Sequence, residues 1–475
     1  MGFLALLLHL GMIMLTRNMA KYLPKAACGI IVAVATLLTG CMSDDYDYET
    51  TGNCVITNIT LGTLNQLVHT KTSSGTDSTY IAAVTGSLYP MSIDHVARRV
   101  FNLDSLPAGT DVSKVVFSNF TSSSSATIRS LVTGRDSVFS VKDSTDFSVP
   151  REITVHAEDG ISKRTYTVEV RVHNEDGEAT TWNRIGISAG LQDAQPKRVI
   201  EAGSRLYVFA VTGNGTPALF SADTSTPAAL EENPITPSTI DPESVVYGEG
   251  MFYALAGGAL MRSTDGIAWN EAGATLPNGC ARFKALALSG TQRLIGVADD
   301  RIISSTDAGN TWQENTRDTQ AGLPTDAITG LCTAPRTGTR HETLVLVGNY
   351  NGAPSVWKQD IDPTGTDNYP WMKLMPATTN ACPPLESYTL AAYDRGILLT
   401  GRSAGNTLAD FYMSYDSGNT WLTAIVSAPA ATGTEFAVAT DNEGHIFLFC
   451  SGTGEVWRGC LNRLGWKSIQ HNFIK

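Results

Sequence analysis

Charged residues and helical patterns are both scarce in this chain of 475 residues. Charged side chains make up only 17 % of the sequence, and no long heptad or stripe of apolar residues at helical spacing occurs. These absences exclude coiled coils and helical bundles, and the many Gly, Ser, Thr and Asp residues favour strands and turns. The length exceeds that of one ordinary hydrophobic core, so we expect two domains.

Sequence motifs of common enzyme chemistry are also missing. The chain has no G-x-S-x-G elbow, no H-E-x-x-H pair, no P-loop and no dinucleotide-binding fingerprint. Eight cysteines occur, but none has C-x-x-C or zinc-site spacing, so we expect no metal and no cofactor. Six of them lie beyond the N-terminal segment and leave several disulfide pairings open: Cys54, Cys280, Cys332, Cys382, Cys450 and Cys460.

Residues 1–40 are typical of a secretory signal. Two lysines precede an apolar run from Ala26 to Leu38, which leads through Thr39 and Gly40 to Cys41. Small residues before a cysteine are typical of a lipobox, in which the thiol accepts a diacylglycerol and becomes the mature N-terminus. The run is shorter than the roughly 20 residues that span a bilayer, which disfavours the alternative of an uncleaved membrane anchor. Met19 would start a normal signal peptide by itself, so residues 1–18 are expected to be an over-extended start.

Residues 41–52 are expected to form a lipidated acidic tether. The stretch "MSDDYDYET" resembles the acidic export tag of Bacteroidetes-type lipoproteins, which implies a place on the outer face of the outer membrane. The alternative is a simple solvated tether. Removal of residues 1–40 takes away three basic residues and no acidic one, so the net charge of −12 becomes more negative. We therefore expect membrane contact through the lipid alone and no binding of nucleic acid.

Residues 53–174 show the pattern of an immunoglobulin-like β-sandwich. About seven short alternating runs, separated by Ser, Thr, Gly and Asp, occupy this region. In "RTYTVEVRV", Tyr166, Val168, Val170 and Val172 point one way, and Thr165, Thr167, Glu169 and Arg171 point the other. The ending resembles the last hairpin of bacterial cell-surface β-sandwich modules, which act as spacers or binding modules. Residues 175–183 are polar and are expected to form the linker.

Residues 184–475 contain a repeat of roughly 40 to 60 residues, a period range that includes propeller blades. Each unit consists of apolar strands, a Gly-rich turn and a Ser-x-Asp or Trp signal. Six units without helices predict an all-β fold with a C-terminal β-propeller of six blades, with seven blades as the alternative.

The strings "SSTDAGNTW" and "MSYDSGNTW" are complete copies of one motif within this repeat. Their Ser and Asp side chains can accept hydrogen bonds from the turn that they begin, Gly supplies a positive φ, and Trp covers the turn. Three copies supply the predicted structural residues: Ser263, Asp265, Gly266 and Trp269; Ser305, Asp307, Gly309, Thr311 and Trp312; Ser414, Asp416, Gly418, Thr420 and Trp421.

This motif resembles the Asp-box, or BNR repeat, of sialidases and sortilin-type receptors. In those families the turns lie on the outer edge of the propeller, which implies a structural role. The layout of lipobox, sandwich and Asp-box propeller resembles Bacteroidetes surface lipoproteins of unknown function, so the resemblance implies no activity.

A sialidase needs an arginine cluster, an activated tyrosine and an acid/base aspartate. "WNRIGIS" has Arg184-Ile185 but lacks the proline of the sialidase Phe/Tyr-Arg-Ile-Pro motif, and no spacing relates the other arginines and tyrosines. The one weak ligand-binding candidate is Asn349, Tyr350 and Asn351, where an aromatic ring and amides suit a sugar; the alternative is an ordinary Asn-Gly hairpin.

Three functions remain open. The first is a non-enzymatic, monomeric lipoprotein whose sandwich is a stalk and whose propeller binds a glycan or a protein. The second is an exo-acting glycoside hydrolase, sialidase-like, with its site at the propeller centre. The third is an assembly partner of an outer-membrane complex. An arginine cluster with a Tyr-Glu pair in the central funnel would favour the second.

Overall fold

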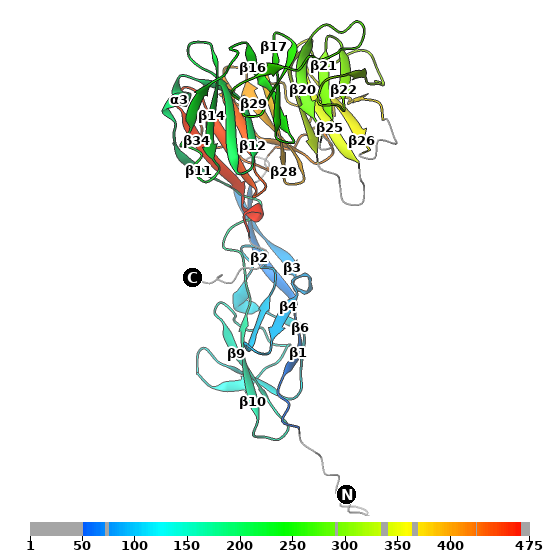
Figure 1. Ribbon diagram of the computed structural model, residues 1–475. Helices are drawn as coiled ribbons and strands as arrows, with labels where there is room; N and C mark the ends of the chain where they lie inside the picture. Colours follow the sequence, from blue (N-terminus) through cyan, green and yellow to red (C-terminus); the bar gives the residue numbers. More distant parts are fainter. Residues whose placement is uncertain are drawn as a thin grey trace, which may run out of the picture.

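A computed structural model of the chain describes residues 51–71, 76–289, 293–333, 341–362, 369–423 and 425–466. The expected signal segment, Cys41 and most of the tether lie outside these ranges. Strands make up almost all the regular structure, which confirms the all-β prediction (Figure 1). Among the described residues, no helix is both long and apolar enough to cross a membrane.

The N-terminal region forms one six-stranded sheet and two two-stranded ribbons. The sheet has the order β4-β5-β10-β9-β7-β8, and its pairs are antiparallel except for β5 with β10. These strands are β4 (Met91–Asp94), β5 (Arg99–Asn102), β7 (Ala126–Arg129), β8 (Asp136–Val138), β9 (Arg151–His156) and β10 (Lys163–Glu169). The ribbons pair β1 (Ile56–Leu61) with β6 (Phe117–Ser122), and β2 (Thr63–Lys71) with β3 (Asp77–Thr85). The immunoglobulin-like label stays a prediction.

This region has a hydrophobic core of its own, and two 3-10 turns, η1 (Gly86–Leu88) and η2 (Val112–Lys114), connect its strands. Tyr166, Val168 and Val170 are buried in that core, as their period-two spacing predicts. The prediction that Arg171 lies on the open face is wrong, because its side chain is only 1 % exposed. Its guanidinium lies 4.0 Å from the centre of the Phe101 ring and pairs with Glu169 at 3.1 Å.

The C-terminal region contains six four-stranded sheets within the described residues. Each begins with an innermost strand and continues outward as an antiparallel meander. The first three are β12 (Gln195–Ala202), β13 (Arg205–Val211), β14 (Pro217–Asp223) and β15 (Glu231–Pro234); β16 (Ile240–Gly248), β17 (Met251–Ala256), β18 (Ala259–Ser263) and β19 (Asn270–Glu271); β20 (Phe283–Leu288), β21 (Leu294–Ala298), β22 (Arg301–Ser305) and β23 (Gln313–Glu314). The next two are β24 (Asp326–Thr333), β25 (Glu342–Tyr350), β26 (Ala353–Ile361) and β27 (Met372–Lys373); β28 (Ser387–Tyr393), β29 (Gly396–Ser403), β30 (Thr407–Leu408) and β31 (Tyr412–Ser414).

The last sheet joins the two ends of the propeller. It combines β32 (Phe436–Thr440), β33 (His445–Cys450) and β34 (Glu455–Leu461) with β11 (Thr180–Ile187), which comes before all other propeller strands. Each innermost strand contacts the next, and β32 contacts β12, so the ring is closed. The predicted linker 175–183 is therefore too long, since its last four residues already belong to β11.

The segment just before β11 contacts the segment that follows β34. The imidazole of His173 stacks on the indole of Trp466 with ring centres 3.3 Å apart, and the Trp466 Nε1–H donates to Glu175 at 3.1 Å. Arg463, in the 3-10 turn η3 (Asn462–Leu464), pairs with Asp394 of the neighbouring sheet. The helical turn α3 (Ala189–Gln192) connects β11 to β12. These contacts place the ring of sheets at one end of the N-terminal region (Figure 1).

The hydrophobic cores of the propeller lie between neighbouring sheets, and the polar turns close their outer ends. Trp312 is 5 % exposed and packs edge-on against Phe283, in a cluster that also contains Leu260 of the preceding sheet. Gly309 has a φ of +87°, and a Cβ there would lie 2.5 Å from Leu260 Cδ2. The turn before Trp312 therefore docks on the adjacent sheet and stabilises the ring as well as itself.

Replacement of Gly309 by alanine tests this docking. Gly352 is the matched control, because it has a φ of +76° and no atom within 4 Å of a Cβ. Both variants carry the strain of a positive φ, but Gly309→Ala must also displace Leu260, so we expect it to lower the free energy of unfolding by about 1–3 kcal/mol more than Gly352→Ala. Urea denaturation measures the difference, and equal losses would contradict a docking role for the turn.

Candidate functional site

Two hollows at the centre of the ring form one polar mouth. They share Glu243, Asp326 and Ala327, and their volumes are about 100 and 180 Å³. Their other lining residues are Pro196, Lys197, Arg198, Asp241, Ser244, Lys284, Ala285, Leu286, Thr325, Ile328, Glu386, Ser387, Tyr388, Thr389, Arg402, Glu435 and Phe436. We call this set the central mouth.

The six innermost strands bring these residues together because all of them enter the ring at the same end. In each of the six described sheets, a charged residue of the central mouth lies at the start of the innermost strand or just before it: Arg198, Glu243, Lys284, Asp326, Glu386 and Glu435. Other described residues of the innermost strands are apolar and buried in the cores between sheets, among them Val199, Val245, Leu286, Leu390 and Val438. The site is therefore a set of charged side chains at one end of the ring of largely apolar innermost strands.

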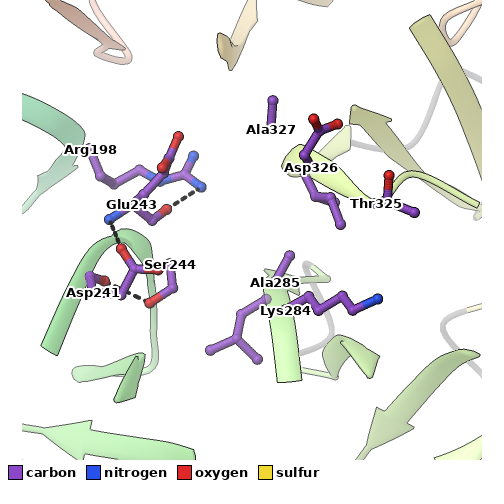
Figure 2. A pocket seen from close by; sticks show the side chains of 11 residues that line it. Arg198, Asp241, Glu243, Ser244, Lys284, Ala285, Thr325, Asp326 and Ala327 are labelled. Carbon is purple, nitrogen blue, oxygen red and sulfur yellow. Dashed lines mark hydrogen bonds between the residues drawn. The ribbon is translucent and has the colours of Figure 1, made fainter. Parts of the chain in front are cut away.

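Arg198 is hydrogen-bonded to the adjacent strand β16 (Figure 2) and to β24, which is not adjacent to β12 in the ring. Its Nη1 donates to Thr329 Oγ1 at 3.2 Å, and its Nη2 donates to the backbone carbonyl of Glu243 at 3.1 Å. Its Nε is buried and has no hydrogen-bond partner among the described residues. Burial lowers the pKa of the guanidinium, and the carboxylates of Glu243 and Asp241 oppose that shift.

A second group of charges in the mouth is already paired. Glu435 accepts from Lys197 Nζ at 3.3 Å and also pairs with Arg402. Arg402 lies 3.1 Å from Glu386 through its Nε. Because these four residues neutralise one another, they hold neighbouring strands together and contribute little free charge to the hollow.

Three charged groups of the mouth have no such partner. Neither the carboxylates of Glu243 and Asp326 nor the ammonium of Lys284 makes a side-chain hydrogen bond or ion pair with any residue that the structure describes. All three residues are exposed to the mouth. The Glu243 and Asp326 side chains come from β16 and β24, which are not adjacent in the ring, and both line the two hollows. The charge of Glu243 interacts with the Arg198 guanidinium, whereas Asp326 faces the hollow from the other side (Figure 2).

The predicted ligand residues Asn349, Tyr350 and Asn351 form a hairpin beside the mouth. Asn349 is the register partner of Asp326. Its side-chain amide is fully engaged, because its Nδ2 donates to Leu385 and its Oδ1 accepts from Tyr388. The ring of Tyr350 faces Lys373 at 5.9 Å, and Asn351 occupies the turn with a φ of 51°. Asn349 therefore supports the mouth from behind, and the role of these three residues as ligand contacts stays a prediction.

The Ser-x-Asp turns lie away from the mouth, between the outer strands. In the third unit, Ser305 Oγ donates to Asp307 at 2.7 Å and accepts from the Gly309 N–H. Asp307 accepts from both the backbone and the hydroxyl of Thr311, and Trp312 Nε1 donates to the Gly309 carbonyl at 2.9 Å. The side chains of Ser305, Asp307 and Thr311 are thus bonded to one another and to the backbone of their own turn, as a structural role requires.

The other two copies repeat this geometry. Ser263 donates to Asp265, and Asp265 accepts from two backbone N–H groups that precede Trp269. Ser414 donates to Asp416, and Asp416 accepts from the backbone and hydroxyl of Thr420. Gly266 and Gly418 have positive φ values of 74° and 91°, as the motif requires. The buried Trp421 lacks the indole hydrogen bond of its counterparts.

The sialidase-like signature finds no counterpart in the mouth. Arg184 lies on β11, the outermost strand of its sheet, where it pairs with Glu455 at 3.0 Å. Tyr388 is the one tyrosine among the lining residues, and its hydroxyl already bonds to Asn349 and to the Pro383 carbonyl. Burial raises the pKa of Tyr388 to about 12, which makes it a poor nucleophile at neutral pH.

Comparison with known protein families agrees with this architecture. Residues 176–469 match the DUF6242 beta propeller domain, and residues 59–170 match the N-terminal domain of the same family, which is described as a domain of unknown function. The chain belongs to the DUF6242 family. The DUF6242 propeller match begins within the predicted linker, close to the start of β11. A comparison with curated proteins finds no match.

Several solved structures are distantly similar to this DUF6242 chain. A Bacteroides thetaiotaomicron protein of unknown function is 10 % identical, with coverage of 78 % of this chain and 98 % of that one and a TM-score of 0.40. The Hadza microbial sialidase Hz136 is 11 % identical, with coverage of 87 % and 91 % and a TM-score of 0.38. A Xanthomonas campestris gluconolactonase is 13 % identical, with coverage of 59 % and 89 % and a TM-score of 0.38. All three TM-scores are too low to carry an argument about activity.

Sequence reasoning missed the residues of the central mouth, although a signal for them exists. A charged residue recurs near the start of the apolar innermost strand in each repeat unit, as in "ESVV" with Glu243 and "DAIT" with Asp326. Because the charged residue is basic in two units and acidic in four, this signal is invisible to a search for repeated letters. It emerges only when the units are aligned on their first strands.

The pKa of Asp307 provides a test of the turn geometry. Hydrogen bonds from the Thr311 side chain, the Thr311 backbone and Ser305 lower the pKa of Asp307 to about 2. Since an unfolded Asp titrates near 3.9, the contribution of this turn to stability is present above about pH 4 and is lost as the pH falls toward 2. A carboxyl-carbon NMR titration should therefore show a midpoint near 2, and Thr311→Val should raise it. A wild-type midpoint near 4 would refute this geometry.

Proposed function

We propose that this DUF6242 protein is a non-enzymatic binding protein whose propeller takes a charged ligand group in the central mouth. The observation that carries the proposal is the shared hollow where Glu243, Asp326 and Lys284 present charges without partners among the described residues. Charged groups that a fold leaves unpaired in a concave site are available for a ligand, and desolvation there strengthens their interaction with it.

The arrangement of the mouth supports binding rather than hydrolysis. The arginines of the mouth do not form a free cluster, because Arg402 is paired with Glu435 and Glu386 while Arg198 is anchored by Thr329. Tyr388 is bonded to the protein itself. No observation favours the sialidase-like alternative over binding. A role as an assembly partner of an outer-membrane complex stays a prediction.

The aromatic content of the mouth bears on the choice between glycan and protein ligands. Sugar rings are commonly held against exposed aromatic faces, whereas the two aromatic residues of the central mouth, Tyr388 and Phe436, are each only 6 % exposed. Unpaired charges of both signs line the space instead. This chemistry favours a charged group, such as one carried by a protein or peptide, over a neutral sugar.

The N-terminal region supports the proposal of a surface lipoprotein. We propose that Cys41 carries the lipid, that the acidic tether and the N-terminal domain form a stalk, and that the propeller is displayed as a monomer outside the outer membrane. The arguments are the small residues before Cys41, the acidic stretch after it, and a propeller held at one end of the N-terminal domain by the stacking of Trp466 on His173 and the pairing of Arg463 with Glu178 of the linker.

Ligand retention tests the binding site. The purified protein is dialysed to equilibrium against a mixture of neutral sugars, charged sugars, amino acids and short peptides, and retained compounds are identified by mass spectrometry. The wild-type protein should retain a ligand that Glu243→Gln/Asp326→Asn loses by at least about tenfold, since removal of a charge from a paired group in a partly desolvated site costs 2–5 kcal/mol or more. Equal retention by both proteins would place the site elsewhere.

Membrane attachment is tested with Cys41→Ser. The wild-type protein should incorporate labelled palmitate and sediment with membranes, whereas Cys41→Ser should incorporate none, because a serine hydroxyl cannot form the thioether. Protease treatment of intact cells should degrade the wild-type propeller if it faces outward. Label in Cys41→Ser would contradict the proposed lipidation site.

A further inference from the structure

The charged residues that line the first hollow of the central mouth include both signs on each side. Arg198 and Glu243 lie on one side of the hollow, and Asp326 and Lys284 lie on the other (Figure 2). A ligand with a single charge would satisfy one sign and leave the other unpaired. The distribution therefore matches a ligand that carries positive and negative groups close together.

The carboxylates of the central mouth fall into two groups, which differ in whether a cationic side chain forms an ion pair with them. Glu435 and Glu386 are compensated by Lys197 and Arg402 within the fold. Glu243 and Asp326 have no equivalent partner in the part of the chain that the structure describes. Both residues are exposed to the mouth, and carboxylates form strong hydrogen bonds with charged N–H donors, so these two positions are complementary to a positive ligand group.

A metal ion is a poorer match for this positive group than an ammonium. Across the described ranges, the one set of three potential metal ligands within 4.8 Å of one another is Asp441, Glu443 and His445. That set lies beyond the far end of β32, whereas the mouth is at its start. Glu243 and Asp326 thus lack a third ligand for a metal, but two carboxylates suffice for the three N–H donors of a primary ammonium.

The cationic groups indicate the remainder of the ligand. Lys284 has a free ammonium, and the buried Nε of Arg198 has no acceptor among the described residues. The exposed Lys284 ammonium can donate to an oxygen acceptor, which a carboxylate or a carbonyl provides, whereas the Arg198 Nε is enclosed by the protein. The hollow volumes of about 100 and 180 Å³ are small compared with the 300–1,000 Å³ of drug-sized sites, so a short group enters.

We propose that the central mouth binds an α-ammonium group next to a carbonyl or carboxylate, as in a free amino acid or the N-terminal residue of a peptide. This inference rests on the proposed binding function of the mouth. The ammonium lies between Glu243 and Asp326, and the neighbouring oxygen accepts from Lys284. The two sources share this chemistry and differ only in the group bonded to the first carbonyl carbon, which is an oxygen in the amino acid and an amide nitrogen in the peptide.

Calorimetric titration of the purified protein tests the ligand class. The probes are L-alanine, L-leucine, the tripeptide Ala-Ala-Ala, its C-terminal amide and its N-acetyl form. We expect binding of at least one probe with a free α-ammonium, and at least tenfold weaker binding of the N-acetyl tripeptide. Binding of the amide as well as the free tripeptide identifies a peptide N-terminus, whereas binding of the amino acids alone identifies a free amino acid.

Variants connect the binding to the mouth. Glu243→Gln and Asp326→Asn should each lower the affinity for the bound probe at least tenfold. Lys284→Ala should lower the affinity for L-alanine or L-leucine more than the affinity for the tripeptide amide. The matched control is Glu271→Gln, which removes an exposed carboxylate from the outermost strand of the sheet that carries Glu243 and should leave the affinity unchanged. The comparison of free and acetylated peptides uses wild-type protein alone, so it stands even if a variant fails to fold.

Two results would overturn the inference. Equal affinity for the free and acetylated tripeptides would show that the ammonium is not recognised, and absence of binding by every probe would exclude this ligand class. The equilibrium dialysis described above can still identify another ligand whose retention is lost in Glu243→Gln/Asp326→Asn. In that case the proposed binding function stands, and only the assignment of an α-ammonium ligand is wrong. If dialysis yields no ligand dependent on the mouth, both fail.

Discussion

The pairing of β11 with β34 is the interaction on which the rest of the molecule depends. It joins residues from the beginning and the end of the propeller, from Thr180 with Leu461 to Ile187 with Glu455, and it completes the last sheet. Without it, β34 would be an open edge of the last sheet, and the apolar cluster against which Trp182 packs would lose a wall. The central mouth exists because closure brings the starts of six strands to one axis.

Closure of the ring also explains why aspartates have different roles on the outer side of the propeller and at its central axis. Asp307, on the outer side, is saturated by hydrogen bonds from its own turn, and that turn docks on the preceding sheet. Asp326, at the axis, begins a strand whose neighbours supply no side-chain partner among the described residues. The outer carboxylate stabilises the ring, whereas the inner one remains available for a ligand. The N-terminal domain contributes to neither role and holds the ring through the linker and Trp466.

Local patterns were sufficient for most of the individual elements. Alternation in residues 163–170 and the Asp159-Gly160 turn predicted the β9–β10 hairpin, and the motif from Ser305 to Trp312 predicted its own hydrogen bonds. Predictions failed where a segment distant in the sequence determines whether a residue is buried or belongs to a strand. Arg171 is buried because Phe101 covers it, and residues 180–183 are a strand because β34 accepts them. Neither partner is adjacent in the chain, so neither effect has a local signature.

The sequence by itself determined the all-β class, the repeat, the chemistry of the Ser-x-Asp turns and the expectation of a lipidated N-terminus, because each depends on residues within a few positions of one another. Only the tertiary structure decided which charges meet. Arg198, Glu243, Lys284 and Asp326 are separated by whole repeat units, and their convergence results from the closed ring of innermost strands. Whether a carboxylate is paired depends on neighbours that the fold supplies, which is why the candidate site became visible only in three dimensions.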